Sequence, residues 1–162
     1  MREQVQYAVM RSSLTGVIVM MLGVVGAGQT QKSASAPTME VYKSPTCGCC
    51  SKWVEHVTQG GVNVKVTELS DDALDALKQK YGVPRTAQSC HTGIVNGYVV
   101  EGHVPVTEIQ RLLKERPAVV GIAVGGMPMG SPGMEVPGRP GQTYNVVTFD
   151  KTGAVKVYST QK

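Results

Sequence analysis

The dipeptide Asn96-Gly97 limits the folds open to this chain more than any other feature of its sequence. Runs of apolar and β-favouring residues flank the dipeptide on both sides, over residues 92–95 and 98–101. Asn-Gly between two such runs is the strongest short-range signal for a β-hairpin with a two-residue turn. Because a turn of this length fixes how the strands pair, the dipeptide predicts both a hairpin and its register.

Hydrophobic periodicity predicts helices and strands on either side of this hairpin. In chain order we expect a strand over 39–42, a helix over 49–59, a strand over 62–69, a helix capped by Ser70, the hairpin, and a helix opened by Pro105. This order, β-α-β-α-β-β-α, is that of a thioredoxin-like α/β domain. In such a domain, parallel strands joined through helices precede an antiparallel hairpin and a closing helix.

The C-terminal part of the chain differs in composition from the part before it. Residues 118–141 are rich in Gly, Pro and Met and show no period, so we expect a long loop there. Two β-favouring runs follow, over 144–149 and 154–158, and Asp150 and Gly153 between them suit the first and last positions of a type I turn. We therefore expect a second hairpin that extends the sheet or folds back over the domain.

Residues 1–28 are predicted to be a secretory signal peptide. Arg2 and Arg11 precede an uncharged segment whose apolar centre, over 17–25, is shorter than the roughly 20 apolar residues of a bilayer span. A basic start, a short apolar centre and small residues after it are typical of such a signal. The alternative is an uncleaved anchor. After cleavage, no stable membrane span is expected to remain.

The rest of the chain divides into a disordered leader over 29–38 and a domain over 39–162, both expected outside the cytosol. The net charge is +4 and no run of like charges is present, so the sequence offers no electrostatic surface for nucleic acid. All four cysteines lie in the predicted domain. In an oxidising compartment such thiols form disulfides, bind metal or perform redox chemistry.

Three of the cysteines form one motif, Cys47-Gly48-Cys49-Cys50, between a predicted strand and a predicted helix. The start of a helix presents free N–H groups and positive potential, which stabilise thiolates. A thiolate is both a nucleophile and a ligand for soft metals. The alternative interpretation is a structural disulfide with one spare thiol.

A second motif brings a thiol and imidazoles to the open end of the hairpin. The predicted register places Cys90 opposite His103, and such partners have Cβ atoms roughly 4.5–5.5 Å apart, unless a bulge shifts the pairing. In the predicted sheet this end lies beside the turn that carries Cys47. We therefore expect four thiols to meet His103 and His91 at one edge, although His91 alone also fits a loop histidine. His56 is expected on a solvated helix face.

Methionines in the predicted loop form a third feature. Met127 and Met129, followed by Met134, lie among Gly and Pro residues. A thioether is a soft, neutral ligand that suits Cu(I). It also suits a hydrophobic cover over the edge of a core, and the two roles are compatible.

The donor set favours copper over other soft-ligand metals. Thiolates and thioethers suit Cu(I), Zn and Fe–S clusters. The usual paired spacing of zinc cysteines is absent, and so are the spacings expected of iron–sulfur ligands. Thiolates that bridge several coppers use crowding of the kind seen in Cys47-Gly48-Cys49-Cys50, so the sequence predicts a multinuclear copper site.

These motifs also resemble those of a known family. The matching segments are Tyr42, Pro45-Thr46-Cys47-Gly48-Cys49-Cys50, Ser89-Cys90-His91-Thr92, Val95-Asn96-Gly97-Tyr98, Glu101-Gly102-His103-Val104-Pro105 and Met127-Pro128-Met129-Gly130-Ser131-Pro132-Gly133-Met134-Glu135. They resemble the periplasmic copper-resistance proteins of the CopG type, a family long catalogued as a domain of unknown function. The similarity extends over about residues 39–160.

The resemblance implies a thioredoxin-like fold and a periplasmic role in copper resistance. It implies copper ligation by Cys47, Cys49, Cys50 and Cys90, with His91 and His103 at the matching histidine positions. It also implies interconversion of Cu(I) and Cu(II), which would make the chain a copper-centred oxidoreductase, and other periplasmic copper-handling proteins as partners.

Two further functions compete with a redox-active copper protein. A thiol–disulfide oxidoreductase would use Cys47 and Cys50, would need no metal and would tolerate the loss of Cys90. Thioredoxins place a cis-proline where this chain has Ser89-Cys90, and a cysteine at that position suits metal better than dithiol exchange. A passive copper chaperone would bind the metal without reversible redox change.

Overall fold

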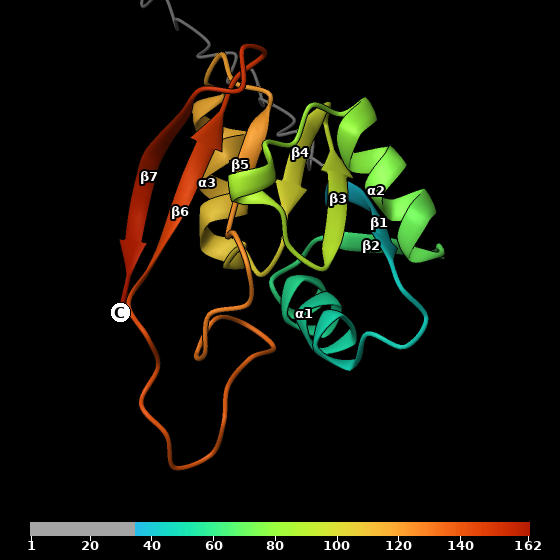
Figure 1. Cartoon of the computed structure of the whole chain (residues 1–162). Coiled ribbons are helices and arrows are strands. Elements are labelled where there is room, and N and C mark those ends of the chain that lie inside the picture. The colour runs from blue at the N-terminus through green and yellow to red at the C-terminus, as the bar shows by residue number, and fades with distance from the viewer. Residues whose placement is uncertain (1–34) are drawn as a thin grey trace, which may run out of the picture. The chain divides into compact units, whose positions relative to one another are not determined.

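The described residues form one seven-stranded sheet with strand order β2-β1-β3-β4-β5-β6-β7, and the helices pack on it (Figure 1). The computed structural model describes residues 35–162, so the predicted signal peptide and most of the predicted leader lie outside the described residues. The elements are β1 (Thr38–Lys43), α1 (Gly48–Gln59), β2 (Asn63–Glu68), α2 (Asp71–Lys80), the 3₁₀ turn η1 (Arg85–Ala87), β3 (His91–Val95), β4 (Tyr98–Glu101), α3 (Val106–Glu115), β5 (Gly121–Ala123), β6 (Tyr144–Phe149) and β7 (Val155–Gln161).

The predicted order β-α-β-α-β-β-α is present from β1 to α3, and the mixed α/β class is confirmed. β1 pairs in parallel with β2, to which α1 joins it, and antiparallel with β3, the first strand of the hairpin. Between residues 35 and 162, no helix has the length and apolar character needed to cross a bilayer.

The hairpin around Asn96-Gly97 forms in the predicted register. Thr92 pairs with Glu101 and Val95 pairs with Tyr98, so the two-residue turn is present without a bulge. Asn96 and Gly97 have φ values of 48° and 84°. Positive φ at both central residues is the requirement of the turn type whose twist matches that of paired strands, which explains why this dipeptide carries so much structural information.

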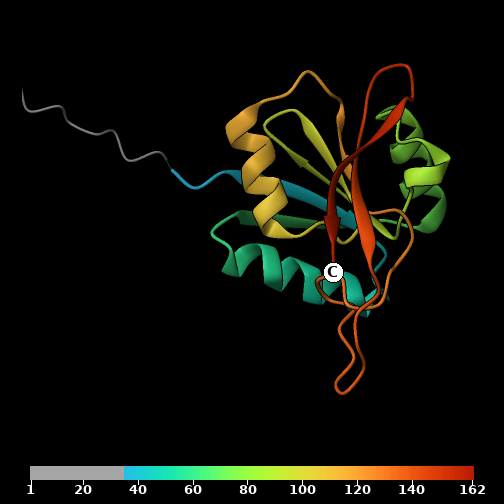
Figure 2. The same ribbon diagram turned by 90° about the vertical axis from the view of Figure 1, so that its left-hand side faces the viewer.

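Two apolar clusters lie on opposite faces of the sheet, α1 and α3 cover one face, and α2 and η1 lie at the other (Figure 2). On one face, Trp53 of α1 and Ile109 of α3 belong to the same buried cluster as Val100 of β4. On the other face, Phe149 packs with Val99, the neighbour of Val100, beside α2 and η1. The alternation of Val99 and Val100 between the clusters follows from the two-residue period of a strand.

The sequence prediction was wrong about residues 118–141 being loop throughout, because β5 forms within them. This strand pairs in parallel with β4 and antiparallel with β6. Three residues are too few to show a period, so the pattern carries no strand signal. Gly121 admits the close approach, because a Cβ atom there would collide with the backbone carbonyl of Val99.

The second hairpin extends the sheet, which is one of its two predicted arrangements. β6 pairs with β5 on one side and with β7 on the other. The predicted turn is present, since the N–H of Gly153 donates to the carbonyl of Asp150 at 3.0 Å. β5 is therefore the strand that joins this hairpin to the rest of the sheet.

His56 lies in a different environment from the solvated face that its position in the helix suggests. The side chain is half-buried, and its Nε2 accepts a hydrogen bond from the N–H of Val106 at 3.0 Å. Val106 is the first residue of α3, and the preceding Pro105 has no side chain that can cap the helix. His56 therefore satisfies one of the unpaired donors at the start of α3 and joins α1 to it.

This contact predicts a pH dependence of stability. Burial lowers the pKa of His56 from its ordinary value of 6.5, while the charge of Glu135 acts in the opposite direction. In the window below 6.5 the unfolded chain binds the proton more readily than the folded chain, so the free energy of unfolding falls as the pH falls. His56→Gln keeps an acceptor for Val106 but does not titrate.

We therefore expect His56→Gln to lose less stability than the unaltered chain between about pH 7.5 and pH 5. Urea unfolding at several pH values measures the two slopes, and their difference is the share of His56, since His91 and His103 remain in both proteins. Equal slopes would show that the His56 imidazole is not linked to folding.

Candidate metal centre

Cys47 is the N-cap of α1, and this position organises the cysteine motif. The backbone of Cys47 is extended, and its Sγ accepts a hydrogen bond from the N–H of Cys50 at 3.3 Å. The sulfur thus occupies the place that a Ser or Asp oxygen takes at many helix starts. Cys49 and Cys50 follow in the first turn, where the helix dipole stabilises negative charge on sulfur.

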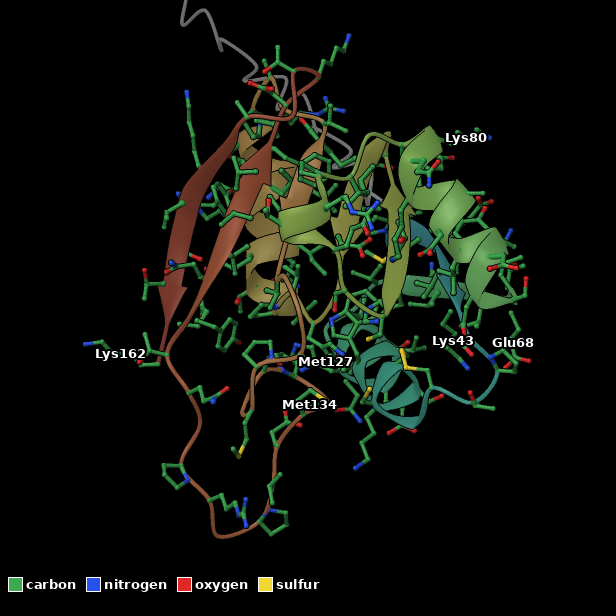
Figure 3. All side chains as sticks on the ribbon, in the orientation of Figure 1. Lys43, Glu68, Lys80, Met127, Met134 and Lys162 are labelled. Atoms are coloured by element: carbon green, nitrogen blue, oxygen red, sulfur yellow. A yellow bond between two sulfur atoms is a disulfide. The ribbon has the colours of Figure 1, made fainter. Side chains whose placement is uncertain are left out.

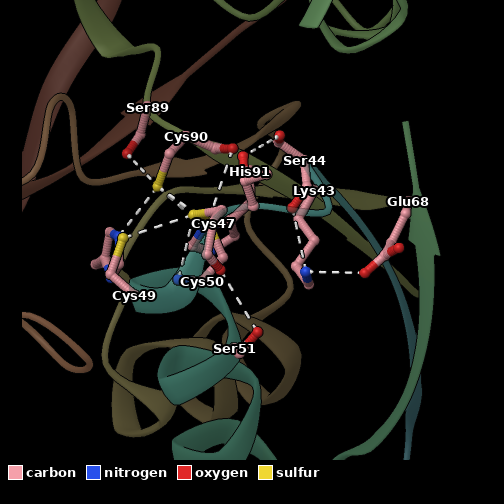
Figure 4. Close-up of a disulfide and its surroundings, with 12 residues drawn as sticks. Lys43, Ser44, Cys47, Cys49, Cys50, Ser51, Glu68, Ser89, Cys90 and His91 are labelled. Atoms are coloured by element: carbon pink, nitrogen blue, oxygen red, sulfur yellow. Dashed lines mark hydrogen bonds and ion pairs between the residues drawn. A yellow bond between two sulfur atoms is a disulfide. The ribbon is translucent and has the colours of Figure 1, made fainter. Parts of the chain in front are cut away.

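The hairpin brings the fourth cysteine to the same place (Figure 4). Cys90 directly precedes β3, and its Sγ lies 3.4 Å from the Sγ of Cys50, although the two residues are 40 positions apart. The Sγ atoms of Cys47 and Cys49 are 3.5 Å apart. All four sulfur atoms lie within 4.8 Å of one another, so the structure brings together the four cysteines that the sequence grouped.

Cys47 and Cys50 form a disulfide, and Cys49 and Cys90 are free thiols (Figure 4). The structure therefore corresponds to an oxidised form, in which the disulfide interpretation of the motif is realised. A site made of four thiolates requires that this bond first be reduced. The Cα atoms of Cys47 and Cys50 are 5.3 Å apart, and both sulfurs already lie beside Cys90 and Cys49.

His103, just beyond the end of β4, lies beside Cys90. Its Nε2 is 3.1 Å from the Sγ of Cys90, as the predicted cross-strand pairing required. Its Nδ1 is 2.8 Å from the carbonyl oxygen of Pro132, which can only accept, so Nδ1 carries the proton. Burial lowers the pKa of His103, so the ring is neutral at physiological pH and Nε2 presents a lone pair to Cys90.

His91 is also buried beside Cys90, with Nδ1 3.4 Å from the sulfur. Its ring packs against the rings of Trp53 and His103, with centroids 4.2 Å and 5.0 Å away. Burial, followed by the neighbouring His103, holds the pKa of His91 well below its usual value. Nε2 of His91 is buried and finds no hydrogen-bond partner within residues 35–162, so this ring has an uncommitted nitrogen there.

Cys90 is thus the residue shared by two groups of donor atoms. Its sulfur belongs to the four-cysteine group and to a second group, with His91 and His103, whose atoms also lie within 4.8 Å of one another. Burial raises the pKa of the Cys90 thiol to about 11, and the Ser89 hydroxyl, 3.8 Å from the sulfur, acts in the opposite direction. Cys90 is therefore protonated at neutral pH in this form, and a soft cation would displace its proton.

The Met-containing loop packs on the first turn of α1 (Figure 3). Gly133 has a φ of +85°, and a Cβ atom there would lie 2.7 Å from the carbonyl oxygen of Cys49. Met127 is 54% exposed, whereas Met129 and Met134 are half-buried. The loop therefore covers the cysteine turn, as one of the two interpretations predicted. Ligation by Met127 or Met129 stays a prediction.

The sequence reasoning missed a buried ion pair behind Cys90. Nζ of Lys78 is 2.6 Å from Oε1 of Glu101, and the two side chains are 4% and 0% exposed. A signal was available, because Lys78 follows Leu74 by four positions and therefore lies on the apolar stripe of α2. Nothing comparable marks Glu101, the last residue of β4.

Removing one member of this pair is expected to cost far more than removing both charges. Lys78→Met leaves the Glu101 carboxylate buried without its partner, which we expect to lower the free energy of unfolding by about 3–5 kcal/mol. The double variant Lys78→Met/Glu101→Gln should recover most of that loss. Denaturant unfolding measures both, with the exposed Lys80→Met as a control within about 0.5 kcal/mol of the unaltered chain. Equal destabilisation of the single and double variants would contradict this account.

Comparison with known proteins places these features in a family. Residues 87–134 match the family model described as "Protein of unknown function, DUF411". No curated protein sequence matches the chain.

Two solved structures resemble the chain over most of its length. "Copper resistance protein copG- Form 2" is 39% identical, covers 78% of this chain and 99% of its own, and superposes with a TM-score of 0.71. "Copper resistance protein copG- Form 1" is 40% identical, covers 76% and 96% respectively, and gives a TM-score of 0.70. At this identity and coverage, with the predicted motifs in place, the chain belongs to the CopG family of copper-resistance proteins.

Proposed function

We propose that the reduced chain binds copper in a multinuclear cluster held by the thiolates of Cys47, Cys49, Cys50 and Cys90, and that it acts in periplasmic copper resistance. The observation that carries this proposal is the convergence of four sulfur atoms within 4.8 Å, from two segments far apart in the sequence. The names of the two similar structures support the link to copper resistance.

The donor set fits Cu(I) well. Thiolate is a soft ligand, and neutral imidazole binds copper in both of its common oxidation states. The crowding of four sulfurs suits thiolates that each bridge two ions, so one site can hold several. Bound copper would supply a one-electron couple for the interconversion of Cu(I) and Cu(II).

The residues around the sulfurs have separate tasks in this proposal. The helix start of α1 holds Cys47 and stabilises its negative charge, while His103 offers Nε2 because Pro132 fixes its proton on Nδ1. His91 is a further candidate ligand. The loop with Met127 and Met129 limits the access of water, and its thioethers are candidate ligands on the open side.

A periplasmic location agrees with the proposed chemistry. The predicted signal peptide would export the chain to an oxidising compartment, and copper-resistance relatives point outside the cytoplasm. In that compartment the Cys47–Cys50 bond forms readily, so the chain would need a source of thiol reductant or a reducing copper donor before it could present all four thiolates. We propose other periplasmic copper-handling proteins as its partners.

Copper titration of the reduced chain tests the proposal. We expect Cys90→Ser to lower the Cu(I) stoichiometry or to weaken the affinity at least about tenfold, because the substitution removes the sulfur shared by both donor groups. A competing chromophoric Cu(I) chelator measures affinity, and elemental analysis measures stoichiometry.

Thr107→Ser, which is exposed on α3, is the control and should bind as the unaltered chain does. An unaltered chain that stays copper-free when supplied with cuprous ion would disprove the proposal, as would a Cys90→Ser variant with unchanged binding. Paramagnetic spectra of the loaded protein, oxidised and reduced, separate a redox-active centre from a passive chaperone.

The disulfide favours one other function, that of a thiol–disulfide oxidoreductase. Cys47 is partly exposed and Cys50 is buried, so a substrate thiolate could attack Sγ of Cys47 and release Cys50 as thiolate. A second substrate thiol would then displace Cys47, which leaves the protein as a dithiol and the substrate as a disulfide.

Turnover without metal distinguishes this function from copper binding. If the copper proposal holds, chelator-treated protein should oxidise a small dithiol no faster than the Cys47→Ser variant does, over repeated cycles with a small-molecule disulfide added as the oxidant. Absorbance or fluorescence of the dithiol substrate measures the rate. Sustained turnover that survives Cys90→Ser but not Cys47→Ser would instead support the oxidoreductase.

A further inference from the structure

The buried pair of Lys78 and Glu101 belongs to a hydrogen-bonded network that reaches the candidate metal centre. Lys78 also donates to Oγ1 of Thr92 at 3.0 Å, and Thr92 donates to Oε2 of Glu101 at 2.6 Å. Oε1 of Glu101 accepts the backbone N–H of Ser89 at 2.7 Å. The network therefore ends on the residue directly before Cys90.

The backbone at Ser89 lies between regular elements. The carbonyl of the preceding Gln88 accepts the N–H of Gly126 at 2.9 Å, and the N–H of Ser89 itself is paired by Glu101. η1 ends at Ala87 and β3 begins at His91, so the sheet ladder does not hold Ser89. The hydroxyl of Ser89 donates to the carbonyl of Gly126 at 2.5 Å, at the start of the covering loop. Its N–H is held by Glu101 alone among the contacts of the described residues.

Lys78 of this pair also borders a pocket beside the centre. Lys78, Cys47, Ser89 and Cys90 line one pocket of about 310 Å³ between α2 and the cysteine turn. A buried ion pair contributes little net stability compared with apolar residues of the same size. The hydrogen bond from Ser89 links this pair to the segment that carries Cys90.

We propose that Glu101, held by Lys78, is a positioning residue that places Cys90 as the fourth sulfur of the metal centre. The Glu101 carboxylate fixes the N–H of Ser89 and so sets the backbone from which Cys90 projects. The other three cysteines take their positions from the start of α1, which this network does not touch. The inference rests on the proposed copper site and specifies how one of its ligands is positioned.

Two double variants separate the hydrogen bond from the charge. Lys78→Met/Glu101→Gln removes both charges, yet the Gln amide can accept the Ser89 N–H and donate to Thr92. Lys78→Met/Glu101→Met also removes both charges and leaves the Ser89 N–H without its acceptor. Both replace the pair by residues of similar volume.

We expect the Gln variant to keep the Cu(I) stoichiometry of the unaltered chain and to bind within about threefold of its affinity. The Met variant should bind at least about tenfold more weakly, because Cys90 no longer holds its place. A merely structural role would instead change the unfolding midpoint and leave the difference in copper affinity between the two variants at zero.

Combining each double variant with Cys90→Ser completes the test. When Cys90 is absent, the Gln and Met variants should bind Cu(I) equally, because the network acts through that residue. Equal affinities with Cys90 present would overturn the inference, and so would a loss in the Met variant that persists with Cys90 absent.

If the Met variant does not fold, Ser89→Pro and Ser89→Ala replace it. Proline lacks the N–H and alanine keeps it, and Gln88 has a ψ of 147°, which suits a following proline. The proline variant should then bind Cu(I) more weakly than the alanine variant, and only when Cys90 is present. Equal Cu(I) affinities of the two variants would overturn the inference. If the unaltered chain binds no Cu(I), the proposed function is wrong. If the unaltered chain binds Cu(I) normally but the effects of the Glu101 and Cys90 substitutions on affinity are additive, only this inference is wrong.

Discussion

The pairing of β3 with β1 and with β4 is the constraint on which the candidate centre depends. β3 is antiparallel to both neighbours, so its start lies beside the end of β1 and the end of β4. The end of β1 leads into the cysteine turn, the end of β4 leads to His103, and Cys90 stands between them. Sulfur and imidazole donors from three segments therefore meet because of backbone hydrogen bonds in the sheet rather than because of contacts among the donors themselves.

This dependence makes the site sensitive to strand register. A shift of one residue in the β3–β4 hairpin would turn Cys90 and His103 to opposite faces of the sheet and separate the sulfur from the imidazole. The Asn96-Gly97 turn prevents such a shift, since a two-residue turn allows only one pairing register. A distant turn with no donor atoms of its own thus determines whether the donors can meet.

Much of the fold was predictable because its signals are local. The Asn-Gly turn, the Ser70 cap and the apolar stripes of α1 and α3 each act within a few residues, and each element appeared at its predicted place. The convergence of Cys90 with His103 was predictable for the same reason, since register follows from the turn. The approach of Cys90 to the cysteine turn followed instead from the expected pairing of the hairpin with the first strand. The assignment of these residues as ligands remains a proposal.

The features that sequence reasoning missed depend on contacts between distant segments. β5 exists because β4 and β6 lie on either side of it, and its three residues carry no pattern. The ion pair of Lys78 and Glu101 joins α2 to β4, and no local sequence pattern predicts that these two residues pair. The cap that His56 provides for α3 is likewise visible only once both helices are in place.

The hydrogen bond from His103 to the carbonyl of Pro132 ties the covering loop to the chemistry beneath it. With the loop seated, the ring is locked in one tautomer and one orientation. If the loop lifts, Nδ1 loses its acceptor and the imidazole becomes free to rotate and to exchange its proton between the two nitrogens. Opening the cover and freeing the ring are then a single event, so a displacement of the backbone at residue 132 would reach the nitrogen that His103 presents to Cys90.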